Sequence, residues 1–291
     1  MTKYNKIIFF NRYHSGDIFV SRGFIKYILS LDLAEEYYYQ HKCDPKLLQD
    51  FPQITSLRPE RHDCPKSTDT DKYIHAWYMM SSHWNSHGPT YTSLYHIFKS
   101  YVENVFKLPF NVDKSTLLPQ IDFSYFKVNH IKDYLESSPY NTKILISNGD
   151  CMSTQASNFD LNPTIQYLAT TYPNALFLVT NKEDIPINLP NVVYTSNIIK
   201  AESNDLIENA YISRYCDIIV GRSSGTYTYS MLKENFEDPT KTFVCCVNSA
   251  HAVLGKWAPP DIVKAKTITV TEQSCDAVSK AVTTHLGGKD V

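Results

Sequence analysis

The chain has 291 residues, of which 43% are hydrophobic and 20% charged, and its formal net charge is −2. That length suits one large domain or two of ordinary size, with enough apolar residues to bury a core. The near-neutral charge lacks the basic excess that binds nucleic acid or anionic membranes, so we expect neither partner. No stretch approaches the roughly 20 apolar residues of a membrane span, so we expect no integral membrane contact and a cytoplasmic location.

The seven cysteines are odd in number and include no C-x-x-C pair. Cys216, Cys245 and Cys246 stand inside apolar runs, where cysteine acts as a small hydrophobic residue. The spacing therefore predicts reduced thiols rather than a disulfide framework or a zinc site.

The first half of the chain begins as an α/β unit and then becomes irregular. Apolar residues predict a strand over 6–10, and helical spacing predicts a helix over 18–33. Proline-containing loops with one weak strand near Ile54 are expected over 41–72. A further strand is predicted over 73–80, followed by helices over 91–106 and 126–135.

From residue 143 the predicted strands and helices alternate regularly. The strands are expected over 143–147, 175–180, 191–194, 217–220 and 242–247, and the helices over 162–171, 205–216, 225–232 and 274–285. Such alternation is typical of a parallel sheet. We therefore predict an α/β fold with two domains, 1–140 and 141–291, divided at a Ser-Ser-Pro-Tyr-Asn turn.

A candidate phosphate site lies where the predicted strand 217–220 gives way to a helix. Ligands of open parallel sheets bind at that edge, and the backbone N–H groups and dipole of a helix start favour phosphate. Ser224, Gly225 and Thr226 would supply these N–H groups. The hydroxyl of Ser223 and the guanidinium of Arg222 could add hydrogen bonds.

The same residues also match G-x-S-x-G, the nucleophile elbow of serine hydrolases, with Ser223 as the nucleophile. Asp261 and His285 are candidates for its acid and base, but no His-Gly-Gly sequence stands upstream to form an oxyanion hole. A serine hydrolase and a non-catalytic nucleotide- or sugar-binding module remain the alternatives.

A second candidate site, His14-Ser15-Gly16-Asp17, lies between the first predicted strand and helix. An aspartate near a helix N-terminus is kept ionised and can take a proton from a hydroxyl. We assign Asp17 and His14 to catalysis, although Asp17 could instead cap the helix. The role of His14 stays open between base, ligand and packing.

Gly16-Asp17 ahead of an apolar helix, together with Ser224-Gly225 at a late strand–helix junction, resembles the heptosyltransferase-like branch of the GT-B glycosyltransferases. The resemblance implies two Rossmann-like domains facing a cleft, with Asp17 as the catalytic base. It also implies that Ser224 and Gly225 hold the donor diphosphate. Further donor contacts follow from it for Ser147, Asn148, Gly149 and Ser153, and for Glu183 at the ribose.

This chain departs from the family pattern at three places. Ser223 stands where the family often has Asp, Thr228 where it often has His, and the 147–154 loop has no Lys. These departures leave a fucosyltransferase-like GT-B branch open.

Two further features concern the acceptor and a metal. Asp69-Thr70-Asp71 is a D-x-D string, but it precedes a predicted strand and lies in a polar run, so we interpret it as a solvated loop and expect no metal site. Arg12, His75 and Trp77 are assigned to acceptor binding, with core packing as the alternative for Trp77.

The sequence as a whole therefore predicts a metal-independent, inverting glycosyltransferase of the hexosyl- or heptosyltransferase class. Its partners would be a nucleotide sugar and a glycan or other hydroxyl acceptor. No cofactor is expected, because the nucleotide sugar is a substrate.

Overall fold

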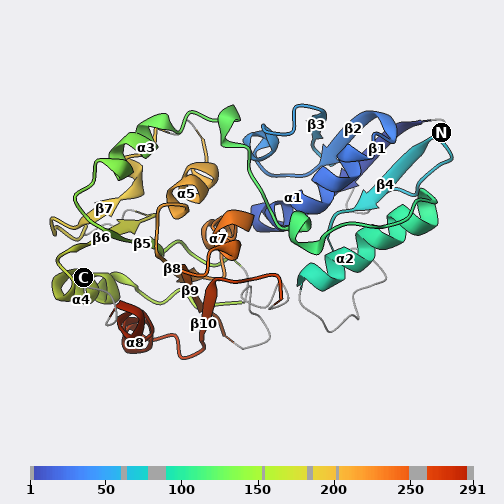
Figure 1. The fold of residues 1–291 in the computed structure, drawn as a ribbon. Coiled ribbons are helices and arrows are strands. Elements are labelled where there is room, and N and C mark those ends of the chain that lie inside the picture. Colours follow the sequence, from blue (N-terminus) through green and yellow to red (C-terminus); the bar gives the residue numbers. More distant parts are fainter. Residues whose placement is uncertain are drawn as a thin grey trace. The chain divides into compact units, whose positions relative to one another are not determined.

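The computed structural model describes residues 3–59, 64–77, 90–152, 155–181, 186–200, 203–248 and 261–286. By their contacts the residues form two units, one ending at Tyr125 and one beginning at Phe126, with Asp261 and Ile262 assigned to the first. Each unit is built on a sheet in which all paired strands are parallel (Figure 1). The predicted class, an α/β protein with two parallel-sheet domains, is confirmed.

The first unit holds a four-stranded sheet in the order β3-β2-β1-β4. Its strands are β1 (Tyr4–Phe10), β2 (Ala34–Gln40), β3 (Ile54–Leu57) and β4 (Asp71–His75). β1 lies in the middle, and its last four residues are buried, as expected for an apolar run between two parallel neighbours.

Two helices of the first unit pack on each other through aromatic rings. Phe24 of α1 (Ser15–Ser30) stacks on Phe98 of α2 (Thr90–Ser100) with ring centroids 5.1 Å apart. α2 continues as a π-helical turn, η4 (Tyr101–Val105). The short 3₁₀ helices of this unit are η1 (Pro45–Leu48), η5 (Lys114–Leu117) and η6 (Phe123–Tyr125).

The middle of α1 is anchored by a buried cation. Arg22 has no exposed surface; its guanidinium donates to the carbonyl oxygens of Gln120 (2.8 Å) and Leu47 (2.6 Å) and pairs with Asp50. The ring of Phe51 lies 4.6 Å from the guanidinium carbon. Removing one member of such a set leaves a buried charge without its partner, so the set makes α1 a rigid support.

The second unit holds a six-stranded sheet in the order β10-β9-β8-β5-β6-β7. Its strands are β5 (Thr142–Ser147), β6 (Ala175–Val179), β7 (Val192–Tyr194), β8 (Ile218–Arg222), β9 (Thr242–Cys246) and β10 (Lys266–Val270). The first strand of the unit, β5, lies in the interior of the sheet, and the chain then builds outward on both sides of it. This is the strand order of Rossmann-like sheets.

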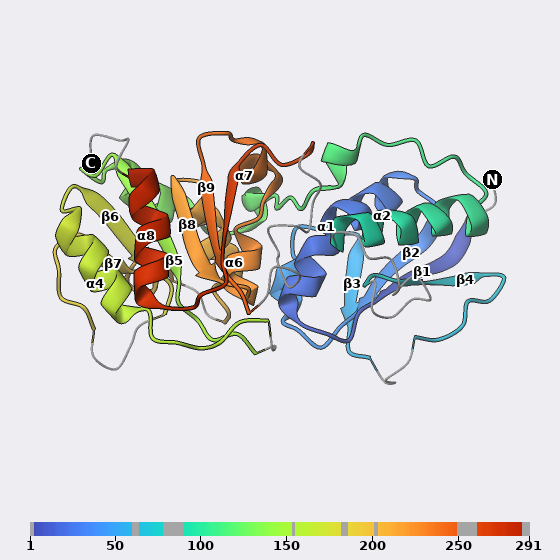
Figure 2. The same ribbon diagram turned by 90° about the horizontal axis from the view of Figure 1, so that it is seen from below.

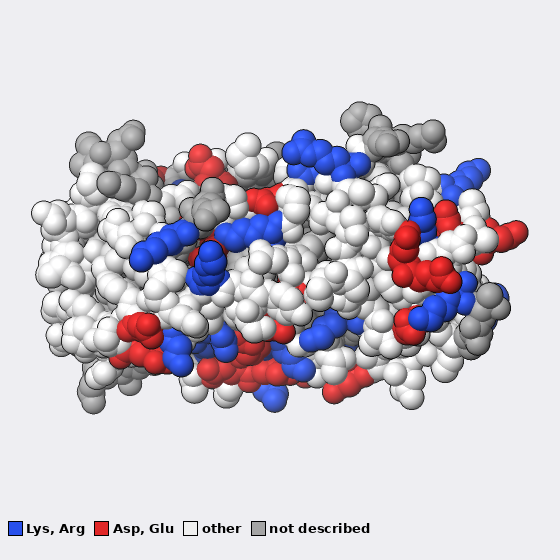
Figure 3. Space-filling view, turned by 90° about the horizontal axis from the view of Figure 1, so that it is seen from above, with Lys and Arg blue, Asp and Glu red and all other residues white. Residues whose placement is uncertain are grey.

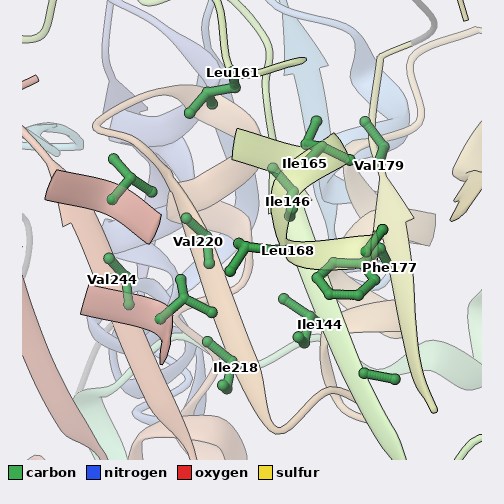
Figure 4. Close-up of a cluster of buried hydrophobic side chains, with 14 of the residues drawn as sticks. Ile144, Ile146, Leu161, Ile165, Leu168, Phe177, Val179, Ile218, Val220 and Val244 are labelled. Carbon is green, nitrogen blue, oxygen red and sulfur yellow. The ribbon is translucent and has the colours of Figure 1, made fainter. Parts of the chain in front are cut away.

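Helices cover both faces of this sheet (Figure 2). They are α3 (Asn129–Glu136), α4 (Asn162–Thr171), α5 (Leu206–Ser213), α6 (Gly225–Tyr229), α7 (Lys233–Glu237) and α8 (Cys275–Leu286), with the 3₁₀ turn η7 (Thr195–Asn197). Leu168 of α4 and Val282 of α8 belong to one buried cluster with alternate residues of the strands, among them Ile146 and Val220 (Figure 4). The other face packs through aromatic side chains, as between Tyr227 and Phe243.

A buried lysine closes the end of α5. The ammonium of Lys241 donates to the carbonyl oxygens of Ser213 (3.1 Å), Arg214 (2.8 Å) and Cys216 (2.7 Å). They lie at and just beyond the end of α5, where carbonyls lack partners within the helix, although that of Ser213 also accepts from the N–H of Cys216 at 3.2 Å. Burial lowers the pKa of Lys241, although the neighbouring acidic groups oppose that shift.

Most predicted elements are confirmed, and the exceptions have physical reasons. β2 and β10 were not predicted, because AEEYYYQ and KTITV lack a continuous apolar run. The helix predicted over 225–232 ends early, as α6, because Leu232 takes an extended conformation, and the next helix, α7, begins at Lys233. β4 begins earlier than predicted, at Asp71, and residues 78–80 of that prediction lie outside the described residues.

The second unit begins with α3, ahead of the turn at which the sequence suggested a domain boundary. α3 contacts α5, so α3 packs with the second unit.

None of the seven cysteines forms a disulfide. In the part of the chain that the structure describes, no helix is both long and apolar enough to cross a membrane. On the face shown in Figure 3, Lys and Arg lie interspersed with Asp and Glu.

Candidate functional site

Both sheets have a point where the strand order reverses, and ligands of open α/β sheets bind outside the carboxyl ends of the strands there. In the first unit this point lies between β1 and β4, which end level with the pair Phe10 and His75. In the second unit it lies between β5 and β8, where Ser147 pairs with Gly221. Most predicted site residues stand in the loops that leave these four strand ends.

The ends of β5 and β8 approach each other closely. A Cβ atom on Gly221 would lie 2.6 Å from the Cβ of Ser147 and 3.0 Å from its carbonyl oxygen, so only glycine fits there. Ser147 is fully buried, and its hydroxyl has no hydrogen-bond partner among the described residues. The buried hydroxyl of Ser224, just beyond β8, has no partner in the described chain either.

Two such hydroxyls at one sheet edge make this edge a candidate ligand site. Leaving a buried polar group without a partner costs about 1–3 kcal/mol, and native structures contain few of them. Ser147 is the last residue of β5 and Ser224 stands two residues beyond β8, at the point where the strand order reverses.

The side chain of Asn148 is used by the protein itself. Its amide oxygen accepts from the hydroxyl of Thr180 (3.2 Å) and the N–H of Asn181 (2.8 Å), and its amide nitrogen donates to the carbonyl of Asn181 (3.0 Å). A Cβ on Gly149 would come within 2.9 Å of the Asn181 side-chain nitrogen. The Asn148 side chain therefore fixes the loop after β5 to the end of β6. A nucleotide-sugar donor would contact the backbone of Asn148 rather than this side chain.

Arg222 has a different task from the one that the sequence suggested. Its side chain is 3% exposed, and it donates to the carbonyl oxygens of Gly149 (3.1 Å) and Ser157 (3.2 Å) and to those of Asn148 and Phe159. All three guanidinium nitrogens are thereby occupied. Arg222 holds the loop after β5 rather than presenting its charge to a ligand.

Ser223 lacks the features of a hydrolase nucleophile. It is 3% exposed, and its hydroxyl donates to the side-chain oxygen of Gln155 at 2.7 Å rather than to a histidine. Its backbone has none of the strain of a nucleophile elbow, since only Asp32 and Lys107 among the described non-glycine residues have positive φ. The structure therefore disfavours the serine hydrolase.

The start of α6 keeps its place but loses part of its predicted electrostatic effect. Ser224, Gly225 and Thr226 are half-buried at the helix start. The helix has only five residues, so its dipole is smaller than that of the helix predicted over 225–232. Thr228, at the family's histidine position, turns its hydroxyl back to the carbonyl of Ser224 at 2.7 Å. Ser153 and Glu183 lie outside the described residues.

Asp17 in the first unit is half-buried, and it does cap the helix. Its carboxylate accepts a hydrogen bond from the backbone N–H of His14 at 2.8 Å. Burial raises the pKa of Asp17 to about 6, although that hydrogen bond and the nearby His14 and Lys42 act to lower it. Burial therefore opposes the effect of the helix start, and a pKa of about 6 still leaves Asp17 mostly ionised at pH 7. A carboxylate with a pKa just below neutrality suits a general base.

The surroundings of Asp17 include residues that the sequence reasoning missed. Lys42 and Cys43 follow β2, and burial raises the pKa of the Cys43 thiol. Tyr39 of β2 is fully buried, with its hydroxyl 3.4 Å from that of Ser21. The signal that was missed is the alternation in AEEYYYQ, which buries Tyr37 and Tyr39 on one face.

The structure brings the predicted acceptor residues to the carboxyl edge of the first sheet. His14 is exposed, and Arg12 is half-buried with its guanidinium carbon 5.5 Å from the centroid of the Tyr13 ring. His75 ends β4, and its backbone N–H donates to the hydroxyl of Tyr101 at 3.3 Å. Trp77 is 7% exposed, which favours the packing alternative for its indole.

The D-x-D string lies away from these loops. Asp71 is the first residue of β4 and Asp69 precedes it, at the opposite end of the strand from His75. Across the described ranges, no group of three or more His, Cys, Asp or Glu side chains is arranged to hold a metal ion.

Comparison with known proteins identifies the fold. No family model matches the sequence, and no curated protein matches it. A glycosyl transferase of family 9 from Veillonella parvula superposes with a TM-score of 0.58 at 11% identity, over 98% of this chain and 97% of that one. The E. coli ADP-heptose LPS heptosyltransferase II gives 0.52 at 10% identity, over 98% of this chain and all (100%) of the other. S. aureus MnaA, solved with UDP, gives 0.53 at 10% identity over 98% and 88%.

These likenesses span nearly the whole chain at very low identity, so they concern the fold. The chain is a two-domain α/β protein with Rossmann-like sheets. Its fold is the GT-B fold of the heptosyltransferase-like structures.

Proposed function

We propose that this protein is a cytoplasmic glycosyltransferase that moves a sugar from a nucleotide-sugar donor to a hydroxyl acceptor. The observation that carries the proposal is the pair of buried hydroxyls of Ser147 and Ser224, which have no partner among the described residues, where the strand order of the second sheet reverses. Support also comes from proteins of this fold solved with ADP or UDP, the E. coli heptosyltransferase WaaC and S. aureus MnaA.

The donor diphosphate would lie against β5 and β8. Its oxygen atoms would accept hydrogen bonds from the two hydroxyls and from the backbone N–H groups of Gly225 and Thr226, since the N–H of Ser224 donates to the carbonyl of Arg222 at 2.7 Å. These hydroxyl and N–H groups would stabilise the negative charge on the leaving diphosphate in place of a metal ion. The donor is consumed as a substrate, and we propose no separate cofactor.

Transfer would proceed with inversion in a single displacement. The acceptor oxygen bonds to the anomeric carbon of the sugar, the bond from that carbon to the diphosphate breaks, and the acceptor proton passes to the carboxylate of Asp17. Arg12 and His75 would hydrogen-bond a glycan or other hydroxyl acceptor at the edge of the first sheet.

The donor site is tested by titrating ADP and UDP calorimetrically into wild type and into Ser147→Ala and Ser224→Ala. We expect each variant to weaken binding at least about tenfold, because each removes a hydrogen bond to a charged group. Neither should destabilise the unliganded protein, since each also removes a buried group that has no partner among the described residues.

Ser213→Ala is the matched control. The Ser213 hydroxyl is buried but donates to the carbonyl of Ala210 and accepts from Asn235. That variant should lose stability and keep its nucleotide affinity. Wild-type protein that binds neither nucleotide would sink the proposal.

Asp17→Asn separates catalysis from binding. We expect sugar transfer to fall about 10²–10⁴-fold, with nucleotide affinity unchanged, because the amide cannot take the proton. Unchanged transfer would remove Asp17 as the base. A tight nucleotide complex without turnover in wild type, with acceptors supplied, would instead make the protein a binding module.

Dialysis against EDTA should leave the transfer rate within about twofold of its starting value if no metal takes part.

A further inference from the structure

Arg222 lies at the end of β8, directly before Ser223, yet its charge is turned inward. We propose that Arg222 is a positioning residue for the donor: it fixes the β5–α4 loop, residues 148–161, and thereby aims the peptide N–H groups of that loop, without contacting the nucleotide itself. The inference rests on the proposed function only in naming a nucleotide as the ligand.

The contacts of Arg222 join two separate segments of the loop. Nη1 donates to the carbonyl oxygens of Asn148 and Gly149 where the loop leaves β5. Nε and Nη2 donate to the carbonyls of Ser157 and Phe159 near its far end, and the Phe159 ring centroid lies 5.3 Å from the guanidinium carbon. One planar cation therefore serves four carbonyls, a geometry that lysine cannot reproduce.

The planarity of the peptide bond means that these carbonyl contacts also fix the direction of the N–H groups in the same peptides. In a trans peptide the N–H points opposite to the C=O, and no cis peptide bond occurs among the described residues. Because the carbonyls of Asn148 and Gly149 point at Arg222, the N–H groups of Gly149 and Asp150 point away from it. They belong to the second and third residues after Ser147, whose hydroxyl has no partner in the described chain, and would supply N–H groups for a ligand's phosphate oxygens.

Other contacts keep the loop folded when the Arg222 contacts are weakened. The N–H of Cys151 donates to the side-chain oxygen of Asn158 at 2.7 Å, and the hydroxyl of Ser223 donates to Gln155 at 2.7 Å. A conservative Arg222→Lys change should therefore loosen the ends of the loop without unfolding the domain.

The first unit offers a matched control in Arg22. It too is buried, donates to the carbonyls of Gln120 and Leu47, pairs with Asp50, and has a phenylalanine ring 4.6 Å from its guanidinium carbon. Arg22→Lys removes the same chemistry from a place that makes no contact with the β5–α4 loop in the described contacts.

The test combines amide hydrogen exchange without ligand and calorimetric titration with ADP and UDP. For Arg222→Lys we expect exchange in the described part of residues 148–161 to rise at least tenfold, and nucleotide affinity to fall about tenfold or more, because the nucleotide must now order the loop. Arg22→Lys should lower the melting temperature and change neither quantity. Phe159→Leu, which keeps the guanidinium, should shift both quantities in the same direction by less.

Two results would overturn the inference. Lost affinity with unchanged loop exchange would mean that Arg222 contacts the nucleotide directly. Faster loop exchange with unchanged affinity would mean that the loop does not serve the site. If Arg222→Lys does not fold, Phe159→Leu answers the same question. Failure of the proposed function would look different, because wild type itself would then bind neither nucleotide.

Discussion

Asp17 combines two properties that a single carboxylate rarely holds on a protein surface. It caps α1 through the N–H of His14, and burial raises its pKa to about 6. The first property fixes the position of the carboxylate, and the second allows it to accept and release a proton near neutral pH.

The raised pKa of Asp17 predicts how activity depends on pH. Because the base must be ionised, kcat/KM for sugar transfer should fall about tenfold for each pH unit below about 6 and level off above 7. Initial rates from pH 4.5 to 8.5 measure this limb. An acidic limb centred near pH 4, the ordinary range of an aspartate, would contradict the assignment of Asp17.

The raised pKa of Asp17 also predicts how the stability of the folded protein depends on pH. The dependence is opposite to that of a salt-bridged aspartate, whose pKa is lowered on folding. The folded protein protonates Asp17 more readily than the unfolded chain does, so the free energy of unfolding should decrease as pH rises from about 4 to 6. The shift from 3.8 to about 6 corresponds to at most about 3 kcal/mol, reduced by solvent around the half-buried carboxylate. Asp17→Asn should therefore unfold at a higher urea concentration than wild type at pH 8.

The urea experiment has an internal and an external control. At pH 4 the advantage of Asp17→Asn should largely disappear, since Asp17 is then uncharged in the folded protein. Asp133→Asn, at an exposed position of α3, should change stability by less than about 0.5 kcal/mol at either pH. An asparagine variant that is less stable than wild type at pH 8 would refute the burial argument.

At the scale of elements, the close pairing of β5 and β8 at their carboxyl ends depends on Gly221. Gly221→Ala would force its Cβ to within 2.6 Å of the Ser147 Cβ, so the strands must separate. We expect a loss of about 1–3 kcal/mol in the free energy of unfolding, as for other overpacked cores, and weaker nucleotide binding because Ser147 moves. Urea unfolding and calorimetry measure the two effects.

Gly23→Ala is the comparison for this prediction. A Cβ there would lie 2.0 Å from the carbonyl oxygen of Leu117, so α1 and η5 must also separate. That variant should lose stability while its nucleotide affinity stays at the wild-type value. Equal losses of affinity in both glycine variants would show that Gly221→Ala weakens binding by destabilising the whole protein and not by moving Ser147 at the paired ends of β5 and β8.

How far the sequence predicts these elements depends on where each one is stabilised. β5, β6 and β9 are apolar and buried on both faces, so local sequence suffices to predict them. Two glutamates follow the first residue of β2, and β10 is an edge strand with mostly exposed residues, so neither has the continuous apolar run that makes β5, β6 and β9 recognisable.

The same limit applies to the candidate sites. Asp17 and Ser224 could be selected as candidates because each follows a recognisable strand. The surroundings of Asp17 could not, because Lys42 and Cys43 come from the end of the missed strand β2. The inward turn of Arg222 could not be predicted either, since it depends on carbonyl groups more than 60 residues away in sequence.

At the scale of the whole molecule, both units end their central strands in loops that carry polar side chains. The second unit holds the unpartnered hydroxyls, and the first holds the carboxylate with the raised pKa. The roles proposed for the two units predict that nucleotide binding and proton acceptance are separable by experiment on the intact chain.

Hydrogen exchange on the intact protein tests that separation. At a nucleotide concentration about 100 times its Kd, binding stabilises the folded state by about 2.7 kcal/mol, which corresponds to about 100-fold slower exchange where the ligand holds the structure. We expect this protection at the ends of β5 and β8 and in the loops after them, and little around β1 and β4, because the proposed donor contacts all come from the second unit. Equal protection around Asp17 with nucleotide alone would mean that the first unit also binds the donor, and the division proposed between the two units would then be wrong.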